Sequence, residues 1–219
     1  MLASDRMVTA HFPIGYEFEN QEDTKIIALD GDKSVHVLIA GNVLLGNEIL
    51  NAAKAQLSQK EGSTTGHEAA ELVRVAYQKI RLANIVHREL EPRGLDLNSF
   101  YARHQQLSPQ VVQMIDQALA TVDLGVEMLV AGPNGEHHTI HTVQNPGILH
   151  ENTSIGHGAI GSGAPHALYS LIEGSYASSM SREEVTKLVK AAKERSEVAP
   201  GVGKDTTIVE IPRKDVVDD

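Results

Sequence analysis

Residues 125–144 read GVEMLVAGPNGEHHTIHTVQ, and this stretch decides the fold class. Its first eight residues predict a buried strand, PNGE at 133–136 predicts a turn, and 137–144 predict a second strand. Two strands joined in this way form an antiparallel hairpin. Runs of helices flank the hairpin on both sides along the chain, so we expect an α+β fold of antiparallel sheets covered by helices.

The elements before the hairpin are read from turn signals and apolar spacing. The first forty residues predict strands, including TKIIALDG at 24–31 and SVHVLIAG at 34–41. Apolar residues at helical spacing then predict a helix from about 42 to 59. A second helix opens with a capping box, Thr65 to Glu68, and is expected to stop at Pro92 and Gly94.

The elements after residue 95 follow the same signals. SPQVVQMIDQALA predicts a short helix starting at Ser108, with Pro109 in its first turn. Another helix is expected over 165–176, and a capping box from Ser181 to Glu184 opens the last one. The final strand is expected at TTIVEI, 206–211.

Composition limits the classes of function. The 219 residues fit one domain, and a formal net charge of −10 argues against nucleic acid or an anionic membrane as a partner. The chain has no cysteine, which excludes thiolate metal ligands and cysteine nucleophiles. There is no apolar run of membrane length and no signal-peptide pattern at the start, so the cytoplasm is the expected location.

Two stretches of the sequence suggest a bound nucleotide or a metal ion, but neither ligand is expected. The stretch APGVGKDTTIVEI, 199–211, resembles a P-loop, but Val198, just before it, stands where the first glycine of a P-loop would be, and Asp205 follows Gly203-Lys204. We therefore expect no nucleotide and no other cofactor. His137, His138 and His141 suggest zinc, but a zinc site needs a further ligand elsewhere. Exposed histidines of a hairpin are the preferred interpretation, and no metal is expected.

Five segments, in chain order, resemble a proteasome β-type subunit, a member of the N-terminal-nucleophile (Ntn) hydrolase superfamily. They are LASDRMVT (2–9), TKIIALD (24–30), VLIAGNVLLGNEIL (37–50), IGSGAPHALYSLIEG (160–174) and the C-terminal helix and strand (181–211). The resemblance implies a four-layer αββα sandwich, with two antiparallel sheets between helix layers. It also implies one domain over 1–219, with an extended insertion at 95–124 and a C-terminal tail at 212–219.

The resemblance implies a catalytic set. In the family an N-terminal threonine attacks the peptide carbonyl and its own α-amine is the base. Lys25 matches the lysine that favours the deprotonated hydroxyl, and Asp5 matches the acid that orients this lysine. Ser162, between two glycines whose amides could face a developing oxyanion, matches the serine that positions the amine. It is also a candidate cap for the helix near Pro165, and the two roles are compatible. Glu197 stands where the family often has an aspartate.

Other positions match the substrate-binding residues of the family. Three residues correspond to positions that bind the substrate backbone or line the specificity pocket: Thr9, Gly41 and Val43. The apolar Val43 suggests a preference for substrates with apolar side chains. Pro200 replaces a serine of the family and has no hydroxyl or N–H to donate.

The nucleophile itself is missing from the printed sequence. In the family the threonine precedes the acid matched to Asp5 by about sixteen residues, so the expected first strand would lie ahead of Met1. We therefore expect a longer reading frame that supplies it, and no peptide hydrolysis by the 219 residues alone.

Three functions stay open from the sequence. The first is a subunit of a proteasome-like, self-compartmentalised threonine endopeptidase that degrades intracellular proteins. The second is a non-catalytic ring or scaffold subunit, and the third is an Ntn amidase acting on small amides. The implied partners are copies of the chain in a ring, a peptide or unfolded-protein substrate, and an ATPase unfoldase.

Overall fold

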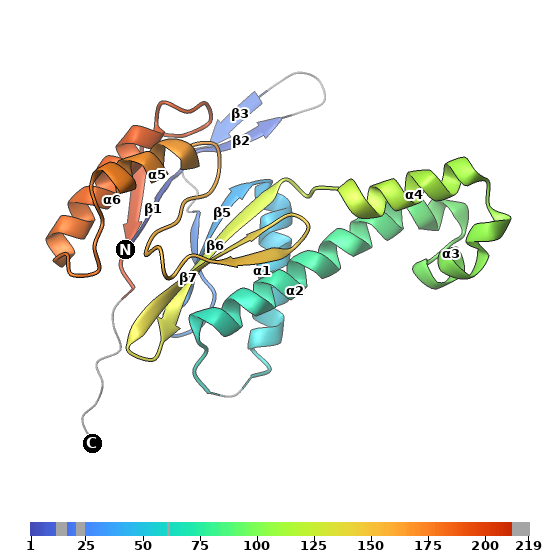
Figure 1. Cartoon of the computed structure of the whole chain (residues 1–219), viewed down its shortest axis with the longest axis horizontal. Helices are drawn as coiled ribbons and strands as arrows, with labels where there is room; N and C mark the ends of the chain where they lie inside the picture. The colour runs from blue at the N-terminus through green and yellow to red at the C-terminus, as the bar shows by residue number, and fades with distance from the viewer. Residues whose placement is uncertain (12–16, 21–24, 61, 212–219) are drawn as a thin grey trace.

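A computed structural model describes residues 1–11, 17–20, 25–60 and 62–211, and it has a mixed α+β fold (Figure 1). All the strand pairs in this part of the chain are antiparallel, as the central hairpin predicts. The tail at 212–219 lies outside the described residues. None of the described helices is long and apolar enough to cross a membrane.

The largest sheet has five strands in chain order, which are β4 (Ile26–Ala28), β5 (His36–Gly41), β6 (Val126–Asn134), β7 (His137–Gln144) and β8 (Ile148–Glu151). The predicted hairpin forms β6 and β7, in which Val130 lies opposite His141. Strand β8 extends the sheet beyond the hairpin and was not predicted. Two smaller sheets pair β1 (Leu2–Asp5) with β9 (Thr206–Val209), and β2 (Val8–His11) with β3 (Glu17–Asn20).

Helices α1 (Val43–Leu57) and α2 (Gly66–Ile85) cover one face of the large sheet. Both begin as the sequence predicts: Asn42 caps α1, and Thr65 and Glu68 form the capping box of α2. The main apolar core lies between these helices and the sheet, because alternate strand residues point toward them. Its fully buried members include Val35, Val37, Ile49, Val73, Tyr77, Met128, Val130 and Val143.

The opposite face of the large sheet packs against the β1–β9 pair. Leu129 and Ala131 of β6 form a second apolar cluster with Leu2, Ile26 and Ile211. Helices α5 (Ala164–Glu173) and α6 (Arg182–Ser196) pack on each other, and α6 also packs on β1. The capping box from Ser181 to Glu184 starts α6 as predicted. The two helix pairs therefore lie on different sides of the strands (Figure 1).

Residues 86–124 form an arm that projects from the sheets (Figure 1). Helix α2 runs on as a π-helical turn and a short 3-10 turn, and Gly94 ends it at φ 65°. Helix α4 (Pro109–Thr121) is capped by Ser108 as predicted, whereas α3 (Leu97–Arg103) was not predicted. The arm has its own apolar cluster, formed by Leu90, Leu95, Phe100 and Ile115.

Candidate active-site cleft

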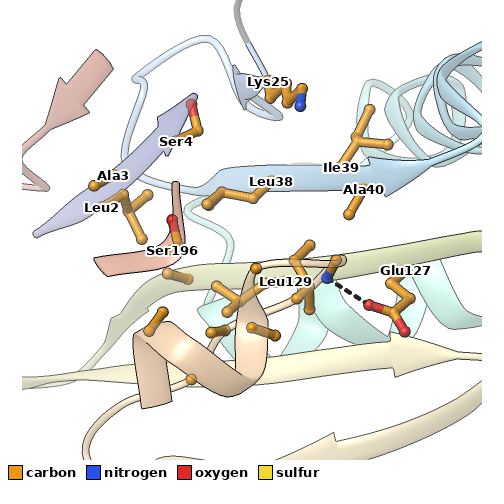
Figure 2. A pocket seen from close by; sticks show the side chains of 18 of the residues that line it. Leu2, Ala3, Ser4, Lys25, Leu38, Ile39, Ala40, Glu127, Leu129 and Ser196 are labelled. Carbon is orange, nitrogen blue, oxygen red and sulfur yellow. Dashed lines mark hydrogen bonds between the residues drawn. The ribbon is translucent and has the colours of Figure 1, made fainter. Parts of the chain in front are cut away.

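A cleft of about 2370 Å³ opens between the β1 side of the molecule and the large sheet (Figure 2). Its walls come from β1, β5, β6, the loop at 153–163 and one side of α6. Five of the seven sequence-predicted site residues line it: Asp5, Lys25, Gly41, Val43 and Ser162. The cleft is therefore the candidate functional site.

Asp5 and Lys25 form an ion pair in the wall of the cleft. The Lys25 Nζ donates to the Asp5 Oδ1 at 2.7 Å, and each side chain is only 15% exposed. The backbone N–H of Met7 donates to the same oxygen at 2.8 Å, which holds the carboxylate at the end of β1. The structure thus brings together two residues that are twenty positions apart, the pairing that the family resemblance implies.

The loop containing Ser162 contacts the rest of the protein through Gly161, Ser162 and Gly163. The Gly161 N–H donates to the Glu127 Oε2 at 2.7 Å (Figure 2). The Ser162 Oγ donates to the Pro200 carbonyl at 3.1 Å. Gly163 lies against Ser196, whose Cβ would be 2.9 Å from a Cβ added at this glycine. Gly163 is the N-cap of α5 and no side chain caps this helix, so the expectation that Ser162 caps it is wrong.

Glu127 is a site residue that the sequence reasoning missed. Because its carboxylate accepts the Gly161 N–H, this amide is not free to face a developing oxyanion, contrary to the expectation for the glycines beside Ser162. The alternation along β6 could have placed Glu127 on the face away from α1 and α2. No local signal indicates its partner, because Gly161 lies 34 residues further along the chain.

Glu197 forms an ion pair with Lys193. The Lys193 Nζ donates to the Glu197 Oε1 at 2.6 Å, and also to the carbonyls of Gly203 and Lys204 at 2.6 and 2.9 Å. The Lys193 side chain is only 5% exposed. Gly203 in turn lies beside Asp5, so the Lys193–Glu197 pair fixes the loop that backs the Asp5–Lys25 pair.

The predicted substrate positions lie on separate elements. Gly41 ends β5 at φ 84°, and a Cβ there would lie 2.0 Å from the Gly125 carbonyl oxygen, so no side chain fits. The next residue, Asn42, donates its N–H to the same oxygen at 2.7 Å. Val43 begins α1 at the edge of the cleft. The backbone of Thr9 lies in β2 opposite Glu19, and its substrate role stays a prediction.

The histidines of β7 differ in burial. His137 is exposed, but His141 is only 1% exposed and packs under His67 of α2, with ring centroids 5.3 Å apart. The expectation of exposed histidines is therefore wrong for His141, because its face of β7 is covered by α2. Within the described ranges, no three His, Asp or Glu side chains are grouped so that they could hold a metal ion.

Acid should destabilise the fold through His141. Neither ring nitrogen of this buried residue has a hydrogen-bond partner among the residues that the structure describes. Burial lowers the pKa of His141 and His67 lowers it further, while Glu151 and Glu71 act in the opposite direction. The unfolded chain, with a histidine pKa of about 6.5, then binds a proton more readily than the folded one. Stability should be constant above this pH and fall as the pH drops below it, by up to about 1.4 kcal/mol per pH unit.

Urea unfolding between about pH 7.5 and about pH 5.5 measures this dependence, above the range in which most carboxylates titrate. His141→Gln should flatten the slope, and His150→Gln, at an exposed position of β8, should leave it unchanged. A wild-type stability that does not change over this range would contradict the assignment. His36, whose pKa burial also lowers, accounts for any slope that remains in His141→Gln.

The sequence matches no protein-family model. A search of curated proteins found no match either.

Proposed function

We propose that the chain is the body of a subunit of a proteasome-like threonine endopeptidase, which assembles with copies of itself into a ring and degrades intracellular proteins. Its fold would be the four-layer αββα sandwich of Ntn hydrolases. Three packing contacts support this: α1 and α2 on one face of the large sheet, β1 and β9 on the other, and α6 on β1. An unfolded polypeptide would be the substrate, and an ATPase unfoldase would deliver it.

The Asp5–Lys25 ion pair is the observation that carries this proposal. A lysine is costly to bury unless it is paired, so an ion pair whose side chains are each 15% exposed, at the wall of a cleft, supports a functional site over a solvated surface contact. The positive charge at Lys25 favours the deprotonated form of any hydroxyl placed beside it. Asp5 fixes the direction of the ammonium and is itself fixed by the Met7 N–H.

The proposed reaction uses an N-terminal threonine on a segment ahead of Met1. Its Oγ attacks the carbonyl carbon of the scissile peptide bond while its own α-amine takes the hydroxyl proton. The tetrahedral intermediate collapses to an ester, and the leaving amine takes that proton. Water, deprotonated by the same amine, then cleaves the ester and regenerates the threonine. Within the described chain, Lys25 stabilises the alkoxide that develops on Oγ, and Asp5 orients Lys25.

A non-catalytic ring subunit is the second candidate. The hydrogen bonds of Ser162 and Glu197 favour it, because both side chains are committed to the loop after α6: Ser162 binds Pro200, and Glu197 binds Lys193. In this alternative the same groups only stabilise the fold. It predicts that no form of the protein reacts with an electrophile directed at an N-terminal nucleophile.

The test that separates the candidates is trapping of the nucleophile. The gene is expressed from the longer reading frame, and the product is incubated with a peptide vinyl sulfone. The endopeptidase proposal predicts one adduct on a new N-terminal threonine. The non-catalytic alternative predicts no adduct.

A further inference from the structure

Glu127 joins the large sheet to the loop that carries Ser162. Because side chains alternate along a strand, Glu127 shares a face of β6 with Leu129, which belongs to the apolar cluster on the cleft side. Its carboxylate accepts the Gly161 N–H at 2.7 Å (Figure 2). A hydrogen bond to an ionised acceptor is about twice as strong as one between neutral groups. This bond is therefore stronger than the neutral one from Ser162 to the Pro200 carbonyl at 3.1 Å.

Gly161 rests on two neighbouring side chains of the large sheet. Ala40 of β5 lies directly opposite Glu127 of β6, so the two side chains lie beside each other on the same face. A Cβ added at Gly161, whose φ is 83°, would lie 3.0 Å from the Cβ of Ala40. Ala40 therefore limits how closely the loop approaches the sheet, and Glu127 binds the loop at that distance. We call Ala40 and Glu127 the seat of Gly161.

Both backbone polar groups of Gly161 are bound. Its N–H donates to Glu127, and its carbonyl accepts the Ala164 N–H at 3.0 Å, where the turn into α5 begins. Ser162 follows Gly161 directly and lies within this turn. The position of Ser162 at the wall of the cleft is therefore set through the backbone of Gly161, and a change at Glu127 reaches Ser162 along this path.

The hydroxyl of Ser162 is suited to accept a hydrogen bond in the cleft. A serine hydroxyl has one O–H donor and two acceptor lone pairs. The bond to the Pro200 carbonyl uses the donor and leaves the acceptor sites of Oγ to an N–H donor. Ser162 is exposed and lines the cleft together with Asp5 and Lys25. In the proposed reaction, the threonine α-amine donates one N–H to this oxygen and keeps its lone pair for the hydroxyl proton.

We propose that Glu127 is a positioning residue: its carboxylate, acting through the Gly161 N–H, places Ser162 where its Oγ accepts an N–H of the α-amine of the attacking threonine. This inference rests on the proposed function for the identity of the amine. The attachment of the loop to Glu127 does not depend on that function. The role is one of geometry, since any acceptor of the same reach at this position holds Gly161, and the negative charge itself is not required.

Hydrogen exchange tests the attachment of the loop in the 219-residue chain. In Glu127→Met the side chain keeps its length and loses its carboxylate, so the Gly161 amide should exchange at least about tenfold faster. Glu127→Asp keeps the charge but is one methylene shorter, and it should show the same increase if it folds more readily than the methionine variant. In Glu127→Gln the amide oxygen accepts the same N–H, and exchange should change by less than about threefold. NMR of the Gly161 amide measures all three.

Peptide hydrolysis by the longer form tests the positioning role. Glu127→Met should lower kcat at least about tenfold with little change in KM, because a displaced amine affects the chemical step more than binding. Glu127→Gln should stay within about threefold of the wild-type kcat, with the wild-type pH profile, because Glu127 neither gives nor takes a proton. Ser162→Ala should also lower kcat, and adding Glu127→Met to it should cost less than a further threefold or about that, because both changes act on the same contact.

Glu136→Met is the matched control. Glu136 is an exposed carboxylate in the turn between β6 and β7, and it does not line the cleft. This variant should keep the exchange rate of the Gly161 amide and the kcat of the wild type. Urea unfolding of every variant distinguishes a displaced loop from a destabilised fold.

Each part of the inference has its own contradicting result. Unchanged exchange of the Gly161 amide in Glu127→Met and Glu127→Asp would overturn the attachment of the loop. Faster exchange with an unchanged kcat, full additivity with Ser162→Ala, or a loss in Glu127→Gln equal to that in Glu127→Met would overturn the positioning role. The expected exchange pattern in a protein whose longer form hydrolyses no peptide would refute the endopeptidase, and the amine with it, and would retain Glu127 as the residue that places Ser162.

Discussion

Lys193→Met is expected to lower the free energy of unfolding by about 3 kcal/mol. The lysine is 5% exposed, and its ammonium pairs with Glu197 and donates to the carbonyls of Gly203 and Lys204. Methionine fills much of the same volume, but it leaves the Glu197 carboxylate and the carbonyls of Gly203 and Lys204 without the ammonium that donates to them. Urea unfolding measures the loss as a shift of the transition midpoint, provided that the dependence of the unfolding free energy on urea concentration is the same in both proteins.

The same helix provides the control. Lys187 and Glu183 form another pair at i,i+4 spacing, with side chains 75% and 78% exposed. Lys187→Met should therefore change stability by less than about 0.5 kcal/mol. Adding Glu197→Gln to Lys193→Met should restore part of the loss, because the unpaired charge is removed. Similar effects at Lys193 and Lys187 would show that the buried pair does not hold the loop.

Lys25→Ala is expected to reduce peptide hydrolysis by the longer form about a thousandfold. In the proposed reaction, the alanine removes the positive charge that would stabilise the developing alkoxide, and it leaves Asp5 without its partner in the ion pair. Hydrolysis of a fluorogenic peptide gives kcat and KM, and the loss should appear in kcat because the charge acts on the transition state.

Lys79→Ala is the control for this experiment, since Lys79 is exposed on α2, which covers the other face of the large sheet. Its kcat should match that of the wild type. If Lys25→Ala retained most of the activity, the assignment of the lysine would be wrong even though the ion pair is present. If Lys25→Ala changed only KM, Lys25 would bind substrate rather than act on the nucleophile.

Features encoded in a few adjacent residues could be predicted from the sequence. The capping boxes at Thr65 and Ser181 depend on a side chain and a backbone group three residues away, and both form as expected. The start of α4 at Ser108 and Pro109 is equally local. The hairpin at β6 and β7 follows from its turn residues and from the apolar residues on both sides. These signals were enough for the α+β class and the antiparallel pairing.

Features that depend on packing were missed. Helix α3 begins with a box from Asp96 to Ser99, a weaker signal than a glutamate at the third position, and its single buried residue is Phe100. The alternation of β7 did not indicate which histidine α2 would cover. In the site, the contacts of Glu127 with Gly161 and of Lys193 with Gly203 join residues that no local pattern connects. The Asp5–Lys25 pair was predicted because the resemblance supplied the long-range information.

The most direct test of the account is the location of the covalent adduct formed by a peptide vinyl sulfone. The longer form is treated with the reagent and digested, and the modified residue is identified by mass spectrometry. The account predicts an adduct on an N-terminal threonine ahead of Met1, with loss of labelling in Lys25→Ala and retention in Lys79→Ala. An adduct on Ser162, on Lys25 or on any other residue of the printed chain, or no adduct at all, would contradict the proposed endopeptidase.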